Sequence, residues 1–242
     1  MKKLIFFNWK CHPESLLQAD RLLAYIRNKE FLKEFEVFVC PPFVFLERLS
    51  QEPLIKTCAQ DCFWQEGPFT GEVSPLMLKS VKCDYVILGH SERKRLFGED
   101  EKTTNRKLKA ALAAKLRPLL FFGEEEKLAI EGARQEILRQ LRISLAGLDK
   151  KALSKTIFVY EPAFAISTQA GQPLTLKEIE EKIRFSRKTL GEKAMVLYGG
   201  SVDESNIKEY LEKTDIDGVV IGQASLDPKR IKKIVEICLK RD

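Results

Sequence analysis

Eight short runs of aliphatic, aromatic and β-branched residues recur along the chain, and each run is almost continuously apolar. Strict alternation of apolar and polar residues would indicate half-exposed strands, whereas continuous apolar runs are typical of a parallel sheet whose outer face is covered. The predicted strands are Leu4–Phe7, Phe35–Val39, Leu54–Cys58, Asp84–Leu88, Leu119–Phe122, Thr156–Tyr160, Ala194–Tyr198 and Gly218–Ile221.

Segments with helical periodicity separate most of these strands. Thr175–Glu178 and Ser201–Glu204 each fit a capping box, in which a hydroxyl side chain and a glutamate satisfy free backbone N–H groups at a helix start. Asp227-Pro228 also fits a helix start, with Asp227 as the N-cap and Pro228 at the first helical position, where the missing N–H of proline costs nothing. Lys107–Leu116 and Arg134–Leu145 carry apolar residues three and four positions apart, as amphipathic helices do.

The alternation of strands and helices predicts an α/β fold, the (β/α)8 TIM barrel, as a single domain over residues 1–242. A doubly wound open sheet is the alternative. Its dinucleotide-binding form has no support, because the first strand is followed by Asn-Trp-Lys-Cys-His and not by a glycine-rich turn.

The composition and the lengths of the apolar runs limit the possible location and binding partners of the protein. No apolar stretch approaches the roughly 18–20 residues that span a bilayer, and the N-terminus is too short in apolar residues for a signal peptide. We therefore expect a soluble, cytoplasmic protein with no membrane partner. The net charge of +6 arises from mixed charges and would attract a small anion, but no long basic block indicates nucleic-acid binding.

Six cysteines include no C-x-x-C pair, and the chain has only two histidines. This pattern predicts buried, reduced thiols and no zinc site. The cysteines are Cys11, Cys40, Cys58, Cys62, Cys83 and Cys238.

Candidate chemistry follows the strand ends, where active sites of such barrels lie. Asn8-Trp9-Lys10 follows the first strand, Gly89–Glu92 the fourth, Glu161-Pro162 the sixth, Gly199–Ser201 the seventh and Gly222–Ser225 the eighth. Five strands would therefore bring a lysine, a histidine, a carboxylate and two loops of small residues to one rim.

Individual residues have ordinary alternatives. Asn8 and Lys10 are two positions apart, so an extended backbone would place them on one face, yet Lys10 alone also fits a solvated surface lysine. His90 alone fits a hydrogen-bonded core histidine. The helical turn expected from Ser91 to Phe97 favours another role, because the positive end of a helix disfavours an imidazolium. A neutral His90 would donate a hydrogen bond to a substrate oxygen.

Two further features indicate a ligand site. Glu161 precedes about a dozen residues that suit neither strand nor helix, so it is either a solvated loop acid or a base beneath a lid. Tyr198–Val202 and the loop at Gly222 follow the seventh and eighth strands, the usual phosphate site of such barrels. We expect phosphate binding there.

Six motifs in order resemble the triosephosphate isomerase family, from Asn8 to Leu226. They are F-N-W-K (7–10), F-T-G-E-V-S-P-L-M-L (69–78), I-L-G-H-S-E-R-K-R-L-F-G-E (87–99), V-Y-E-P (159–162), L-Y-G-G-S-V (197–202) and D-G-V-V-I-G-Q-A-S-L (217–226). The resemblance implies interconversion of D-glyceraldehyde 3-phosphate and dihydroxyacetone phosphate, in glycolysis and gluconeogenesis, with neither metal nor cofactor.

The resemblance also implies roles for residues. Glu161 would move a proton between adjacent carbons, and His90 would polarise the carbonyl oxygens and shuttle the hydroxyl proton. Lys10 and Asn8 would stabilise the enediolate, and Glu92 would hold Lys10 in place.

Further roles concern the phosphate, the lid and a second subunit. Backbone N–H groups of Ser167, Ser201, Gly222 and Gln223 would bind the phosphate, while Tyr198 and Ser201 would latch the closed lid. The same family resemblance implies a homodimer in which the Phe69-Thr70-Gly71 loop inserts into the neighbouring subunit, with Thr70 near its catalytic residues. An ordinary surface turn would leave Phe69 exposed without reason.

The chain differs from the family pattern at six positions. They are Ser167 for glycine, Gln169 and Ala170 for glycine and lysine, Phe164 for tryptophan, Gln223 for glycine and Phe121 for cysteine. A glycine-only backbone angle at Ser167 or Gln223 would cost about 1–3 kcal/mol. Phe121 would crowd Glu161 or dry its surroundings.

Two other functions compete with catalysis of this reaction. A barrel used only for binding or as a scaffold would be free to lose Lys10, His90, Glu92 or Glu161, and all four are present. Another phosphate-binding barrel isomerase or synthase is disfavoured by the N-W-K and G-H-S-E motifs.

Overall fold

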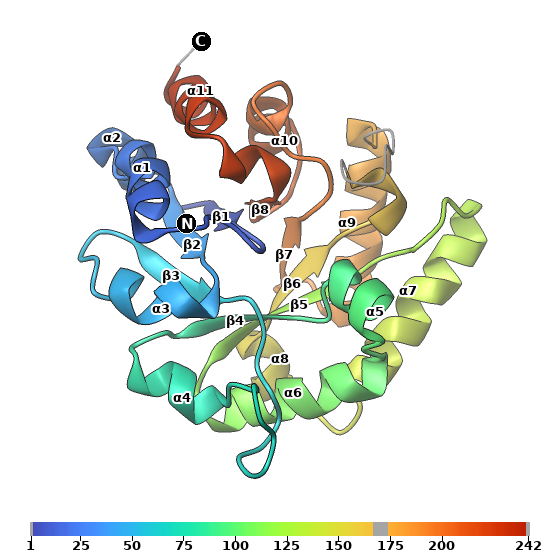
Figure 1. The fold of residues 1–242 in the computed structure, drawn as a ribbon. Coiled ribbons are helices and arrows are strands. Elements are labelled where there is room, and N and C mark those ends of the chain that lie inside the picture. The colour runs from blue at the N-terminus through green and yellow to red at the C-terminus, as the bar shows by residue number, and fades with distance from the viewer. Residues whose placement is uncertain (1, 167–173, 241–242) are drawn as a thin grey trace.

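The computed structural model describes residues 2–166 and 174–240. Its eight strands form one closed parallel barrel in chain order, in which β1 pairs with both β2 and β8. Figure 1 shows the strands at the centre with the helices around them. The strands are β1 (Leu4–Asn8), β2 (Glu36–Cys40), β3 (Lys56–Ala59), β4 (Tyr85–Leu88), β5 (Arg117–Phe122), β6 (Ile157–Tyr160), β7 (Met195–Tyr198) and β8 (Gly218–Ile221).

The TIM barrel predicted from the sequence is confirmed, and each strand overlaps the predicted run. The helices are α1 (Leu16–Ile26), α2 (Lys29–Glu34), α3 (Phe43–Leu49), α4 (Pro75–Ser80), α5 (Ser91–Phe97), α6 (Glu101–Ala113), α7 (Ile130–Ser144), α8 (Lys150–Lys155), α9 (Leu176–Leu190), α10 (Ile207–Lys213) and α11 (Pro228–Leu239). Short 3₁₀ helices are η1 (Ala163–Ala165) and η3 (Gln223–Leu226).

Two of the three predicted helix starts are confirmed. The Thr175 hydroxyl accepts a hydrogen bond from the Glu178 N–H at 3.3 Å, and the Glu178 carboxylate accepts one from the Thr175 N–H at 2.8 Å, which completes the capping box of α9. Asp227 caps α11 by accepting a hydrogen bond from the Lys229 N–H at 2.8 Å.

The capping box predicted at Ser201–Glu204 is wrong, because α10 begins only at Ile207. The Asn206 side chain accepts a hydrogen bond from the Asp203 N–H at 2.9 Å, which closes a turn instead. Asp and Asn side chains that bond to nearby backbone compete with helix formation in this way. The small-residue loop after β7 is therefore not the first turn of a helix.

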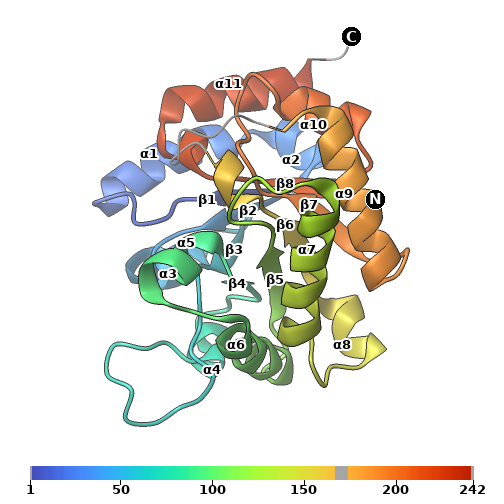
Figure 2. The same cartoon turned by 90° about the vertical axis from the view of Figure 1, so that its right-hand side faces the viewer.

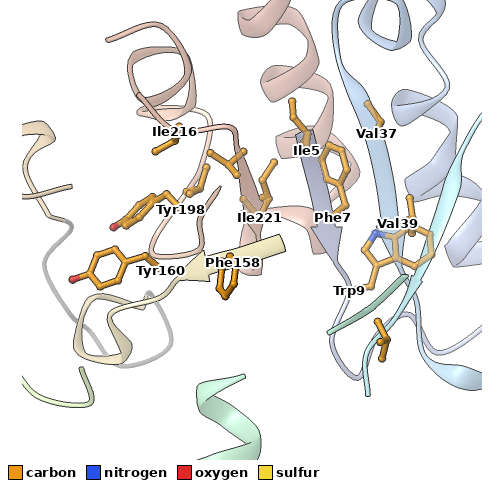
Figure 3. Packing of buried hydrophobic residues seen from close by; sticks show 14 of the residues in the cluster. Ile5, Phe7, Trp9, Val37, Val39, Phe158, Tyr160, Tyr198, Ile216 and Ile221 are labelled. Atoms are coloured by element: carbon orange, nitrogen blue, oxygen red, sulfur yellow. The ribbon is translucent and has the colours of Figure 1, made fainter. Parts of the chain in front are cut away.

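Apolar side chains form two layers, one inside the barrel and one between the barrel and the helices. Phe6 and Phe38 point inward and stack with ring centroids 4.1 Å apart. Ile5 and Phe7 of the same strand point outward, because successive strand residues face opposite sides. Figure 3 shows this outer layer, with Phe7 on β1 and Tyr160 on β6. The two-sided burial accounts for the continuous apolar runs in the sequence.

The barrel closes where β8 meets β1, and Gly218 makes this contact possible. Gly218 pairs with Leu4, and a Cβ at position 218 would lie 2.7 Å from the Leu4 backbone nitrogen and nearer still to its carbonyl oxygen. Side-chain atoms do not approach backbone atoms so closely, so the strands would have to separate.

The first prediction concerns this closure. Gly218→Ala is expected to lower the free energy of unfolding by about 1–3 kcal/mol, because the added methyl group overpacks the β1–β8 contact. Urea unfolding measures the change. Gly132→Ala in α7 is the matched control, since its Cβ would meet only one atom at 3.7 Å. It should be neutral or stabilising by up to about 1 kcal/mol. Equal unfolding free energies for the two variants would contradict the argument.

The segment 62–74 between β3 and α4 extends away from the barrel in both views (Figures 1 and 2). Thr70 is exposed on it. Phe69 is half-buried, because its ring packs on Phe63 with centroids 4.6 Å apart. The expectation that a surface turn would leave Phe69 exposed without reason is therefore wrong, and this ring alone does not indicate a partner.

The six cysteines are free thiols, and they differ in how deeply they are buried. Four cysteines are buried as free thiols, but Cys11 is exposed and Cys238 is half-buried. The prediction of burial is wrong for Cys11, which lies in the open turn after β1.

Within residues 2–166 and 174–240, no helix is long and apolar enough to cross a membrane.

Candidate active site

Three polar side chains meet at the carboxyl ends of separate strands. Asn8 ends β1, His90 follows β4 and Glu161 follows β6. All three are buried, with exposed fractions of 4%, 5% and 5%. The Asn8 side-chain nitrogen lies 3.5 Å from Nε2 of His90. The parallel barrel therefore brings together residues that are far apart in the sequence, as predicted.

His90 is the N-cap of α5, and this position fixes the protonation of its ring. Its Nδ1 accepts a hydrogen bond from the Glu92 backbone N–H at 3.1 Å. An imidazolium has no free lone pair to accept such a bond, so this contact favours the neutral ring with its proton on Nε2. This geometry agrees with the neutral histidine that the sequence predicts.

Glu161 is held by two neighbouring groups. Its Oε1 lies 3.2 Å from Nε2 of His90, and its Oε2 accepts a hydrogen bond from the Ser91 backbone N–H at 3.1 Å. A carboxylate buried in this way needs such donors, because removal from water otherwise favours its neutral form. Glu161 is therefore not a solvated loop acid. It is a buried carboxylate beside a neutral imidazole.

Lys10 lies at the same site, but its backbone conformation differs from the predicted one. The expectation of an extended backbone is wrong, because Lys10 has a φ of 51° and lies in a turn. Its N–H donates to the Asn8 side-chain oxygen at 3.1 Å, which closes this turn. The Gln60 side-chain nitrogen also donates to the Lys10 carbonyl oxygen at 2.8 Å. These bonds hold a backbone conformation that is unfavourable for a non-glycine residue.

The Lys10 ammonium group forms an ion pair with Glu92, as the sequence predicts. Burial favours the neutral form of the Glu92 carboxyl, whereas the hydrogen bond and the charge of Lys10 favour its ionised form by lowering its pKa. Glu92 therefore remains ionised and keeps the lysine beside the strand ends.

Two adjoining cavities share Asn8, Lys10, His90 and Gln223 in their walls. The smaller cavity is also lined by Glu161, Gly199, Gly200 and Gly222. The larger one has a volume of about 460 Å³ and extends over Cys11, Leu96 and Phe97. The predicted catalytic side chains and the small-residue loops after β7 and β8 therefore surround one space.

The expected phosphate residues are only partly placed in this space. Gly222 and Gln223 line it, and Ser201 directly follows the lining residue Gly200. Gln223 does not adopt the glycine-only backbone angle that would cause strain, because its φ is not positive. Ser167 lies outside the described residues.

The other residues singled out from the sequence lie in different parts of the structure or outside its described residues. Tyr198 is buried, and its hydroxyl has no hydrogen-bond partner in the described part of the chain. Thr70 is on the extended segment 62–74 and does not belong to the walls of either cavity. Gln169 and Ala170 lie outside the described residues, whereas Phe164 lies half-buried in η1.

Phe121 lies inside the barrel, directly beneath the site. Its ring centroid is 4.9 Å from that of His90. A Cβ added to Gly199 would lie 3.5 Å from both the Phe121 ring and the Glu161 Cβ. Phe121 is buried, so it excludes water from the barrel side of the site.

Sequence reasoning missed two groups that hold the site. The Ser91 N–H binds Glu161, and a helix start beside His90 was the available signal for it. Gln60 supports the Lys10 turn by donating to the carbonyl oxygens of Lys10 and Cys40, both at 2.8 Å. A single glutamine after a strand carries no signal of this kind in the sequence.

The closed parallel barrel and the carboxylate, imidazole and lysine at its strand ends define a TIM-barrel enzyme with acid–base groups at its rim. Residues 3–238 match the family model described as triosephosphate isomerase. The chain belongs to the triosephosphate isomerase family.

Individual relatives agree with this assignment. The chain is 36% identical to a triosephosphate isomerase of Dictyoglomus turgidum, over 97% of this chain and 98% of that protein. It is 40% identical to one of Dehalococcoides mccartyi, over 97% of this chain and 94% of that protein. The crystal structure of triosephosphate isomerase from Bartonella henselae superposes with a TM-score of 0.81 at 30% identity, covering 99% of this chain and 100% of that one.

The second prediction concerns the Lys10–Glu92 pair. The hydrogen bond and the charge of Lys10 lower the pKa of Glu92, so the pair adds stability at neutral pH that is lost as Glu92 becomes protonated in acid. Glu92→Gln should lower the free energy of unfolding at neutral pH by up to about 1 kcal/mol, with a smaller effect in acid.

Urea unfolding near neutrality and in acid tests this pH dependence. Glu131→Gln is the control, because the Glu131 side chain is 73% exposed. A cost of Glu92→Gln that stays the same at both pH values would contradict the assigned role of the pair.

Proposed function

We propose that Glu161, His90 and Lys10 carry out the reaction of this family, the interconversion of D-glyceraldehyde 3-phosphate and dihydroxyacetone phosphate. The observation that carries the proposal is the 3.2 Å contact of the buried Glu161 carboxylate with Nε2 of His90, at a cavity that Lys10 also lines. A positioned base and a hydrogen-bond donor are the two groups that proton removal beside a carbonyl requires.

The proposed reaction begins at Glu161. Its carboxylate removes a proton from the carbon next to the carbonyl, and the C–H electron pair forms the carbon–carbon double bond of an enediolate. Nε2–H of His90 donates a hydrogen bond to the oxygen that gains charge, and the Lys10 ammonium stabilises that charge. Glu161 then returns the proton to the adjacent carbon while His90 moves the hydroxyl proton, so the two isomers differ only in hydrogen positions.

Substrate binding must rearrange the resting contacts. Nε2 of His90 carries one proton and cannot donate fully to Glu161 and to a substrate oxygen at once. Glu161 would therefore leave His90 when substrate enters and turn towards the substrate carbon. The Glu92 N–H, which donates to Nδ1 at 3.1 Å, would keep the imidazole in place.

The phosphate of the substrate would bind at the loops after β7 and β8. Gly222 and Gln223 line the cavity that contains Glu161, and Ser201 follows the lining residue Gly200. Their backbone N–H groups would bind the phosphate. Ser167 completes the proposed set. Tyr198, which is buried at the end of β7, would latch a lid together with Ser201.

We further propose a homodimer formed through the Phe69-Thr70-Gly71 loop. The cavity of about 460 Å³ beside Lys10 has an apolar edge at Leu96 and Phe97, which are 64% and 67% exposed. The extended segment of a second copy would cover this edge and bring Thr70 near Lys10 and Glu92. Apolar exposure of this kind is typical of an interaction surface.

The proposal extends to the setting of the enzyme. We infer one catalytic domain over residues 1–242, working in the cytoplasm in glycolysis and gluconeogenesis. A single closed barrel from Leu4 to Ile221 supports one domain, and the free thiols are compatible with a reducing compartment. The alternative of a non-catalytic phosphate-binding or scaffold barrel is not favoured by the family.

The third prediction tests catalysis. Purified protein should convert D-glyceraldehyde 3-phosphate to dihydroxyacetone phosphate in a coupled assay, and Glu161→Gln should lower kcat by about 10²- to 10⁴-fold by removing the base. Inhibition by inorganic phosphate should remain. The exposed Glu126→Gln variant is the control and should keep parental turnover. No turnover above the uncatalysed rate in the parent would refute the proposed function, and full activity of Glu161→Gln would remove this residue from its role.

The fourth prediction tests assembly. Sedimentation should give the parent about twice the mass of one chain, and Phe97→Asp should yield monomers, because an unpaired charge is costly to bury in an apolar contact. Leu138→Asp on α7, at a position that is 43% exposed, is the control and should stay dimeric. A monomeric parent, or a dimeric Phe97→Asp variant, would count against the proposed contact.

A further inference from the structure

Glu124 is a buried carboxylate that none of the catalytic steps uses. It follows β5, and only 2% of it is exposed. Its Oε2 accepts a hydrogen bond from the Tyr160 hydroxyl at 3.0 Å, and its Oε1 pairs with the Lys182 ammonium of α9 at 2.5 Å. Burying a charge costs free energy unless it is paired and hydrogen-bonded, so this arrangement requires both partners.

The partners of Glu124 lead directly to the catalytic base. Tyr160 is the last residue of β6, and Glu161 follows it. Because successive strand residues face opposite sides, Tyr160 points outward towards the helices while Glu161 points into the site. Figure 3 shows the Tyr160 hydroxyl pointing away from the barrel, beside that of Tyr198. A fixed Tyr160 side chain therefore restrains the direction of Glu161.

The backbone beside Glu124 holds the base from both sides. The Glu161 N–H donates to the Phe122 carbonyl oxygen at 2.8 Å, and the Ala163 N–H donates to the Glu124 carbonyl oxygen at 2.8 Å. Gly123, between these two acceptors, packs on the chain so closely that a Cβ would lie 2.6 Å from the Glu161 carbonyl carbon. Residues 122–124 therefore form a support for the backbone of Glu161.

This support is anchored in turn by α7 and α9. Gln140 is 3% exposed and binds both backbone groups of Gly123, accepting from its N–H at 3.1 Å and donating to its carbonyl oxygen at 2.8 Å. Lys182 supplies the anchor from α9. Burial foremost, and next the charge of Glu124, raise the pKa of Tyr160, so its hydroxyl keeps the proton that it donates.

We propose that Glu124 is a positioning residue for the catalytic base: through Tyr160 and Lys182 it ties the end of β6 to β5 and α9, and so aims the Glu161 carboxylate at the substrate carbon. The inference rests on the proposed role of Glu161. Glu124 touches no reacting atom. Its effect should appear in kcat and not in phosphate binding, because Glu124 is not among the described residues that line the cavity beside Gly200, Gly222 and Gln223.

Tyr160→Phe tests the link with the smallest change, since it removes one hydroxyl and keeps the Glu124–Lys182 pair. A displacement of the base by a fraction of an ångström should lower kcat about 10-fold. KM and the inhibition constant of inorganic phosphate should stay within about twofold of the parent. Glu124→Gln keeps the shape and an acceptor for Tyr160, so its loss of kcat should be smaller than that of Glu124→Leu.

A double-variant cycle separates this role from general stability. If Glu124 acts through Tyr160, Tyr160→Phe combined with Glu124→Leu should be no slower than Glu124→Leu alone. Tyr210→Phe is the matched control, because it also removes the hydroxyl of a buried tyrosine but lies on α10, and it should keep parental kcat.

The outcomes are distinct. Additive losses, a kcat of Tyr160→Phe within about twofold of the parent, or an equal loss in Tyr210→Phe would each overturn the positioning role. An inactive parent would refute the proposed function itself, whereas an active parent with an unaffected Tyr160→Phe variant would refute only this inference.

Discussion

The first turn of α5 is the constraint on which the site depends. Two consecutive backbone N–H groups there have side-chain acceptors: that of Ser91 binds the Glu161 carboxylate, and that of Glu92 binds Nδ1 of His90, each at 3.1 Å. One short helix therefore places the base and sets the tautomer of its partner. Because these donors are backbone groups, side-chain substitution in α5 leaves them in place.

The barrel makes this constraint effective over long separations in sequence. Parallel pairing in chain order brings the carboxyl ends of β1, β4 and β6 to one rim, so a carboxylate that follows β6 can reach a helix that follows β4. The closure at Gly218 keeps this geometry fixed. Lys10 adds its charge from a strained turn, which three separate contacts stabilise. The unfavourable backbone conformation of this turn therefore lies at a site that needs a positive charge.

The sequence predicts the barrel well because burial on both faces leaves a signal in every strand. It also predicts the union of Lys10, His90 and Glu161, since strand ends converge in any such barrel. Local details are less predictable. Thr175 caps a helix as expected, whereas Ser201 does not, because Asp203 and Asn206 form a competing turn.

Long-range partners give no signal in a single sequence. Lys10 was expected on an extended backbone, but the Asn8 side chain and Gln60 hold it in a turn. Gln140 and Lys182 support the base from helices that lie near β5 only in the folded chain. Their contacts depend on side-chain direction across packed elements, which periodicity does not specify.

The central claim is that α5 keeps His90 neutral with its proton on Nε2, and nitrogen NMR of histidine-labelled protein tests it most directly. The chain has only two histidines, so His12→Gln assigns the signals. We predict one-bond proton coupling at Nε2 and an unprotonated Nδ1 for His90 at neutral pH. A proton on Nδ1, or protons on both nitrogens, would contradict the account.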